Sequence, residues 1–211
     1  MNAFFDAVAA GDVSAVEAEL AQKPALASAR SPEGISALLV AAYRGHHGVV
    51  DALRSAGAEL DAFDAAALGD LTLLERQLDL DPNLAEAFSA DGFTALHFAA
   101  FFGRPDAVAL LLTRAAPIEA EARNDMRVRP LHSAAACFEP KARRRCCELL
   151  LEAGAEVDAR QQGGFTALME AAQHGDAELV RLLLARGADP HLAADDGRTA
   201  ANIGSLDAPQ V

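Results

Sequence analysis

The chain has 211 residues, of which 18 are basic and 31 acidic, so its formal net charge is −13. A surface of that sign repels phosphate backbones and anionic lipids, which argues against nucleic acid and membranes as partners. No apolar run approaches the roughly 18 residues that span a bilayer, and no basic segment precedes an apolar one at the N-terminus. Three cysteines, an odd number, do not indicate a disulfide framework, so the sequence predicts a cytoplasmic protein.

The N-terminal half of the chain repeats at a fixed interval. Residues 2–30 hold two helical patterns separated by Gly11, and residues 31–60 add a turn and two further helical patterns. The same order returns 58 residues later, where Gly69 corresponds to Gly11 and Gly103 to Gly45. Duplication of a pair of units explains this common register.

The clearest unit runs from Gly92 to Pro117 and reads GFTALHFAAFFGRPDAVALLLTRAAP. Thr94 stands where the first amide groups of a helix need an acceptor. Gly103 suits the end of that helix, and Pro105 suits the first turn of the next one. A unit of two short apolar helices cannot bury its own apolar faces, so it must stack against similar units.

The residues TALHFAA, the glycine after them and the run VALLL resemble the ankyrin repeat, a helix-turn-helix unit of about 33 residues. The resemblance implies an all-α solenoid of about six stacked units with short hairpin-like turns, in a single domain over residues 1–211. The approximate repeats are 2–30, 31–60, 61–88, 89–123, 124–160 and 161–193, followed by a C-terminal cap at 194–205.

Two departures from the family pattern carry expectations of their own. The unit at 61–88 lacks the Thr-Ala-Leu-His motif, so we expect its first helix to be short and to have no projecting hairpin before it. The unit at 89–123 ends its second helix with Ala115-Ala116 where the family has Gly-Ala, so we expect a distorted turn there.

The fifth unit, at 124–160, contains six extra residues within CFEPKARRR, between its two helices. Insertions in solenoids lie on loops at one face, frequently the binding face. From Arg123 to Arg145 there are seven basic and two acidic residues, a local charge of +5. This stretch is either a solvated loop neutralised by neighbouring acidic units or a cationic spot that selects an acidic segment of a partner.

The cysteines and histidines of the chain suit structural positions better than chemistry. Cys146 and Cys147 occupy core positions of their helix, whereas Cys137 falls at a normally exposed position. The spacing fits no zinc pattern, and His97 and His132 match the histidine of the family's first helix. No phosphate loop or triad-like spacing is present, so the sequence predicts no enzyme, no catalytic residue, no cofactor and no metal.

Aromatic residues gather at the positions that line the concave face of ankyrin solenoids. The single tyrosine and four of the ten phenylalanines map there. Exposed aromatic and arginine side chains commonly dominate binding energy, although Phe93 and Phe165 could instead pack against neighbouring turns. The predicted partner-binding residues are Tyr43, Arg44, Phe93, Phe101, Phe102, Met126, Arg127, Val128, Phe165, Gln173 and His174.

The resemblance therefore implies a non-catalytic module that binds another protein through the concave face of the solenoid, and the basic stretch and the aromatic residues favour an acidic or apolar segment of that partner. We expect a monomer that binds neither nucleic acid nor membranes. Two alternatives stay open: an enzyme whose site is shared between repeats, and a scaffold that associates with itself. Abundant alanine and only two lysines indicate a bacterial source.

Overall fold

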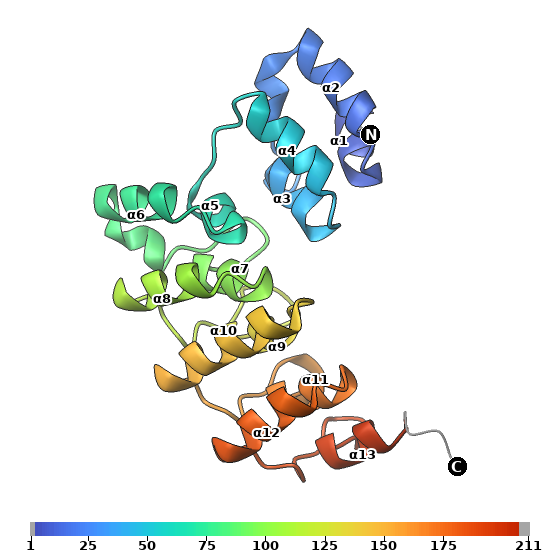
Figure 1. The fold of residues 1–211 in the computed structure, drawn as a ribbon, viewed down its shortest axis with the longest axis vertical. Coiled ribbons are helices and arrows are strands. Elements are labelled where there is room, and N and C mark those ends of the chain that lie inside the picture. Colours follow the sequence, from blue (N-terminus) through green and yellow to red (C-terminus); the bar gives the residue numbers. More distant parts are fainter. Residues whose placement is uncertain (1–2, 207–211) are drawn as a thin grey trace.

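The computed structural model describes residues 3–206, which form thirteen α-helices and no strand. They build the all-α solenoid that the sequence predicts, an elongated stack of helical hairpins (Figure 1). The outermost residues of the predicted domain, 1–2 and 207–211, lie outside the described part. The helices are α1 (Ala3–Ala10), α2 (Val13–Gln22), α3 (Ala37–Tyr43), α4 (His47–Ser55), α5 (Ala62–Leu68), α6 (Leu71–Leu80), α7 (Ala95–Phe101), α8 (Pro105–Thr113), α9 (Pro130–Ala135), α10 (Pro140–Glu152), α11 (Ala167–Gln173), α12 (Ala177–Ala185) and α13 (Ala200–Leu206).

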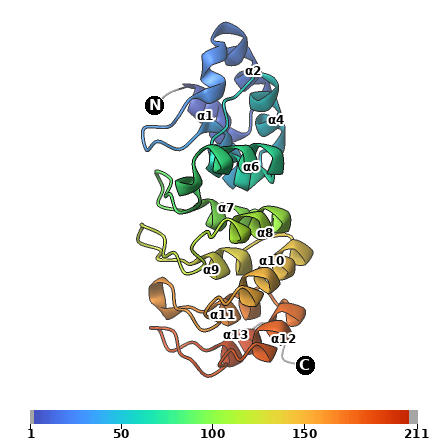
Figure 2. The same ribbon diagram turned by 90° about the vertical axis from the view of Figure 1, so that its left-hand side faces the viewer.

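The helices form two layers. Odd-numbered helices from α1 to α13 stack on one another as an inner layer, and even-numbered helices cover them as an outer layer. The loops before the inner helices project to the side away from the outer layer (Figure 2). None of the helices in residues 3–206 is long and apolar enough to cross a bilayer.

The outer layer is interrupted between α4 and α6, which make at most a marginal contact (Figure 1). The apolar core is divided at the same place. One cluster of buried residues joins α1 to α4, and a second, larger one runs from α5 to α12 and also includes Leu39 of α3. Between them, Ser36 donates a hydrogen bond of 2.5 Å to the buried carboxylate of Asp64.

The turns before the inner helices are as predicted, but the helix at 62–68 is not short. Antiparallel bridges join Arg30 to Ser36 and Phe88 to Thr94, and no such bridge precedes α5. Nevertheless α5 has seven residues, as α3 and α7 do. Its start is stabilised without a threonine, because Asp61 and Asp64 each accept a hydrogen bond from the backbone amide of the other.

The turn after α8 keeps the same backbone as its glycine-containing counterparts. Ala115 has a φ of 58°, and the amide of Ala116 donates to the carbonyl of Leu111 at 3.0 Å. The equivalent bond after α4, from Ala58 to Leu53, is 3.1 Å long. The expected distortion is therefore absent, and the alanine instead takes a left-handed conformation that costs an L-residue about 1 kcal/mol or more.

The extra residues of the fifth unit extend a helix and do not form a projecting loop. Helix α10 has 13 residues, against nine in α8 and in α12. Pro140 occupies its first turn, and the Glu139 carboxylate accepts a hydrogen bond of 2.6 Å from the amide of Ala142. Arg143, which we expected on a projecting edge, is only 5% exposed.

The prediction that Cys137 is exposed is also wrong, since only 3% of its surface remains accessible. Its sulfur packs against the turn that follows α7. A Cβ atom on Gly103 would lie 2.7 Å from Cys137 Sγ, so only a glycine permits this close approach. The φ of 63° at Gly103 also favours glycine. Cys146 and Cys147 are buried, as predicted.

Candidate functional site

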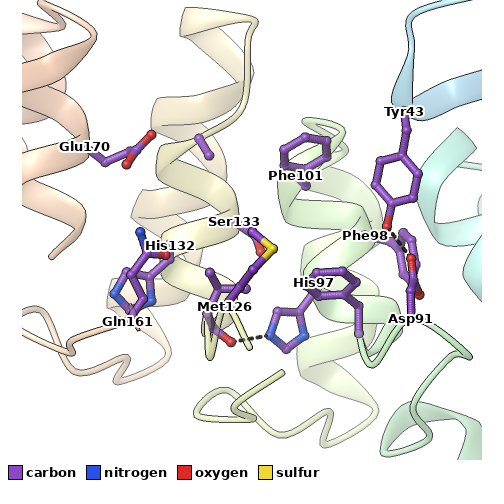
Figure 3. A pocket seen from close by; sticks show the side chains of 13 residues that line it. Tyr43, Asp91, His97, Phe98, Phe101, Met126, His132, Ser133, Gln161 and Glu170 are labelled. Carbon is purple, nitrogen blue, oxygen red and sulfur yellow. Dashed lines mark hydrogen bonds between the residues drawn. The ribbon is translucent and has the colours of Figure 1, made fainter. Parts of the chain in front are cut away.

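A groove of about 400 Å³ lies between the projecting loops and the inner helices (Figure 3). Side chains from four units of the stack border it, and most of its surface is apolar. The lining residues are Tyr43, Asp91, Phe93, His97, Phe98, Phe101, Met126, Val128, His132, Ser133, Ala136, Gln161 and Glu170.

Aromatic rings form one half of the groove. The ring of Tyr43 lies 6.1 Å from those of Phe98 and of Phe101, and Phe93 meets Phe98 edge to face at 6.0 Å. Such pairs stabilise one another by about 0.5–1.5 kcal/mol beyond the burial of their area. Phe98 is buried and its ring contacts those of Tyr43 and Phe93, so it holds these two rings in place.

Tyr43 also connects the second unit to the fourth, past the unit at 61–88, through its hydroxyl group. Its hydroxyl donates to Asp91 Oδ2 at 2.8 Å, and the Ser89 hydroxyl donates to Asp91 Oδ1 at 2.5 Å. Burial and, next, the charge of Asp91 raise the pKa of Tyr43. The hydroxyl therefore stays protonated and keeps donating, which ties the end of α3 to the loop before α7.

The two histidines of the groove have structural hydrogen bonds. Nδ1 of His97 accepts from the amide of Thr94 at 3.2 Å, and Nε2 lies 3.1 Å from the Val128 carbonyl in the next unit. His132 repeats this arrangement with the amide of Arg129 and the carbonyl of Ala159, at 3.1 and 2.9 Å. Burial lowers the pKa of His97 to about 4 and also lowers that of His132, so both rings are neutral near pH 7.

Five of the predicted partner-binding residues lie together in the groove. Tyr43, Phe93 and Phe101 belong to its aromatic half, and Val128 and Met126 border it from the next loop. Met126 is 52% exposed, so it stands at the rim of the groove.

The other six predicted residues do not line the groove. Arg44 is exposed beyond its Tyr43 end, and Phe102 packs against the apolar core. Arg127 pairs with Glu121 at 2.8 Å, and Phe165 packs against the apolar cluster that Met169 of α11 forms with the C-terminal cap, beneath the guanidinium of Arg198. Gln173 and His174 are exposed at the end of α11.

Several lining residues were not predicted, although a positional signal for three of them exists. Phe98, Ser133 and Glu170 each occupy the place directly after the histidine position of their inner helix. That place faces the groove in α7, α9 and α11. Gln161 and Asp91 come from the loops before the inner helices, where the sequence pattern is weaker.

The arginines of the fifth unit are engaged in ion pairs. Arg129 Nη1 lies 2.7 Å from Glu119 and 2.5 Å from Glu156, and Arg145 pairs with Glu148 at 3.0 Å. Arg143 and Arg144 both approach the carboxylate of Asp176, at 3.3 and 3.5 Å, and Arg144 also pairs with Glu178. The structure favours the reading in which neighbouring acidic units neutralise this stretch.

The thiols and carboxylates do not form a reactive cluster. Burial raises the pKa of Cys146 to about 12 and also raises that of Cys147, so both thiols are protonated. Among residues 3–206, no group of three or more histidine, cysteine, aspartate or glutamate side chains is placed to hold a metal ion.

Comparison with known protein families matches the described stack from residue 33 to residue 203. A model of ankyrin repeats in three copies matches residues 62–161, one of ankyrin repeats in many copies matches 150–203, and a single ankyrin repeat matches 33–65.

Individual proteins with similar sequences are much longer than this chain. It is 36% identical over 132 residues to the probable E3 ubiquitin-protein ligase XBOS31 of Oryza sativa subsp. japonica, a match that covers 62% of this chain and 28% of the relative. It is 30% identical over 144 residues to the mouse (Mus musculus) ankyrin repeat and SAM domain-containing protein 6, covering 68% and 12%. A putative ankyrin repeat-containing protein of Treponema pallidum is 33% identical over 130 residues, covering 61% and 42%. The chain thus spans less than half the length of each of these relatives.

Proposed function

Because the chain belongs to the ankyrin repeat family, we propose that it is a non-catalytic module that binds another protein through the groove on its concave face. Solenoids present extended concave surfaces that serve for binding. The observation that carries the proposal is the groove, an apolar depression of about 400 Å³ bordered by four units of the stack.

The rigidity of the groove supports this function. Phe98 and the Tyr43–Asp91 hydrogen bond hold the aromatic half in place, and the histidines bind its loops to the inner helices. A surface that is already ordered loses little conformational entropy on binding, so its contacts contribute more directly to affinity. Aromatic anchors in a desolvated pocket are also where binding energy commonly concentrates.

The alternative of a shared catalytic site is disfavoured by the bonding of His132. This ring lies in the groove next to Ser133, where a nucleophile and base would be sought. However, its Nδ1 accepts from the Arg129 amide and its Nε2 proton is held by the Ala159 carbonyl. A ring with both nitrogens engaged in this way has no site left to accept a proton from the serine.

Two arginine substitutions, two residues apart, test the proposal. Ala136→Arg places a long cation in the groove, whereas Phe138→Arg adds the same charge at a side chain that is 81% exposed and outside the groove. Partners captured by the full-length wild-type chain and identified by mass spectrometry should be lost with Ala136→Arg and kept with Phe138→Arg. Equal capture by both variants, with unchanged circular dichroism, would show that the groove is not the binding surface.

A further inference from the structure

The charged groups of the groove are all acidic and lie at its two ends. Figure 3 shows Asp91 at one end, beside Tyr43, and Glu170 at the other, with Met126 and Ser133 between them. No lysine or arginine is among the lining residues.

Among residues 3–206, neither carboxylate has a partner with a permanent positive charge. Asp91 accepts hydrogen bonds from the hydroxyls of Tyr43 and Ser89, both of which are neutral donors. Glu170 lies 3.4 Å from Nε2 of His174, on the next turn of α11. This differs from the fifth unit, where arginines pair with Glu119, Asp176 and their neighbours. The acidic ends of the groove are thus sites where a cation from outside can bind.

Unused polar groups lie between the two ends. Within residues 3–206, the hydroxyl of Ser133 and the side-chain amide of Gln161 make no hydrogen bond to protein, although Ser133 is largely buried. The surface around them is apolar, since Phe98, Phe101 and Val128 border the same space. An apolar side chain fits there, and the two polar groups can bind the backbone that carries it.

We propose, on the premise of the proposed function, that the groove takes a segment of a partner protein in which a bulky apolar residue lies between two lysine or arginine residues. The apolar side chain enters among Phe98, Phe101 and Val128, and the flanking cations reach Asp91 and Glu170. A cation at each end offsets the desolvation of carboxylates that a neutral segment would cover without compensation. An acidic segment would meet like charge at both ends and in the chain as a whole, whose net charge is −13.

A random dodecapeptide display library selected against the immobilised full-length chain tests this inference. Enriched peptides are synthesised with a fluorophore and their affinities are measured by anisotropy at low and high salt. The variants are Asp91→Asn and Glu170→Gln, which keep shape and remove charge. The control is Asp51→Asn, an exposed residue of α4 without an ion pair in the described residues. Ala136→Arg reports whether the peptides occupy the groove.

The expected peptides carry lysine or arginine on both sides of a bulky apolar residue. Asp91→Asn and Glu170→Gln should each weaken binding by about two- to five-fold at low salt, the range of exposed ion pairs. The loss should shrink at high salt, where charges are screened. Asp51→Asn should leave the affinity unchanged, and Ala136→Arg should abolish binding.

Other outcomes separate the two proposals. Peptides without basic residues, or equal affinities for the acidic variants and the control, overturn this inference. If Ala136→Arg still abolishes binding in that case, the groove remains the binding surface and the proposed function stands. Binding that survives Ala136→Arg contradicts both. In a further outcome, the selection enriches no peptide, while an apolar dye or a second copy of the chain binds the groove saturably. That result overturns the basic segment as occupant as well.

Discussion

The buried ion pair between Arg143 and Asp176 provides the sharpest test of how the repeats are joined. Arg143 extends from α10, where its Nη1 lies 3.3 Å from Asp176 Oδ2 in the next unit and its Nε donates to the Cys137 carbonyl at 2.6 Å. Both charged side chains are 6% exposed. Arg143→Met would leave the Asp176 carboxylate buried with only Arg144, at 3.5 Å, to offset its charge.

Breaking a buried pair by removing one partner costs about 3–5 kcal/mol. Since Arg144 compensates in part and Met retains the apolar volume, we expect Arg143→Met to lower the free energy of unfolding by about 3 kcal/mol. The matched control is Arg145→Met on the same helix, where an exposed pair with Glu148 predicts a loss of less than about 0.5 kcal/mol.

Urea unfolding followed by far-ultraviolet circular dichroism measures both losses. The double variant Arg143→Met with Asp176→Ser separates charge from capping, because a serine still accepts the Leu179 amide bond that Asp176 makes at 3.1 Å. It should recover most of the stability lost in the single variant. Equal losses for Arg143→Met and Arg145→Met, or simple additivity in the double variant, would refute the reasoning.

Three further predictions follow from buried or strained groups. Ala115→Gly should raise the free energy of unfolding in urea by roughly 0.5–1 kcal/mol, because glycine takes the left-handed turn without strain; an unchanged value would mean that the turn is relaxed. Burial and, next, the charge of Asp61 raise the pKa of Asp64 to about 6, above its value of about 3.9 in the unfolded chain. Between these two values the folded state binds one more proton than the unfolded state, so the free energy of unfolding falls as pH rises. Asp64→Asn should remove that loss, so that the free energy of unfolding of the variant rises by roughly 2–3 kcal/mol relative to that of the wild type between pH 4 and 7. Parallel curves of unfolding free energy against pH for the two proteins would contradict this. The buried thiols of Cys137, Cys146 and Cys147 should react with a chromogenic disulfide reagent only after unfolding, and fast labelling of the native chain would argue against their burial.

The repetitive part of the fold could be predicted because the same local pattern recurs in register. Thr94 bonds to His97, and His97 bonds to the Val128 carbonyl of the next unit, so the motif that marks the sequence is also the one that joins repeats. The length of α5 was mispredicted because Asp61 and Asp64 stabilise its start by a different pair of residues with the same geometry. A threonine is sufficient but not necessary at that position.

The secondary structure of the insertion could not be predicted from its length. Six extra residues can form a loop or lengthen a helix, and the charge of the stretch suits both. Glu139 followed by Pro140 is a helix start that local reasoning could have used. The burial of Arg143 and Cys137 depends on Asp176 and on the turn after α7, which are distant in sequence.

The candidate site was predicted where it depends on loop tips and helix ends. The repeat pattern predicted its aromatic half, because Tyr43 and Phe101 occupy equivalent positions in two units. The contact between Tyr43 and Asp91 was not, since it joins residues 48 positions apart over an intervening unit.

The interruption of the outer layer between α4 and α6 has a consequence for cooperativity. Stability in a solenoid is approximately the sum of the units and of the interfaces between neighbours, so the weakest interface divides the chain into blocks. Helices α1 to α4 have an apolar core of their own. They can therefore gain or lose structure as one block, while α5 to α12 remain folded around the larger core. Since Tyr43 belongs to the first block and the rest of the groove to the second, an intact groove requires both blocks to be folded at once.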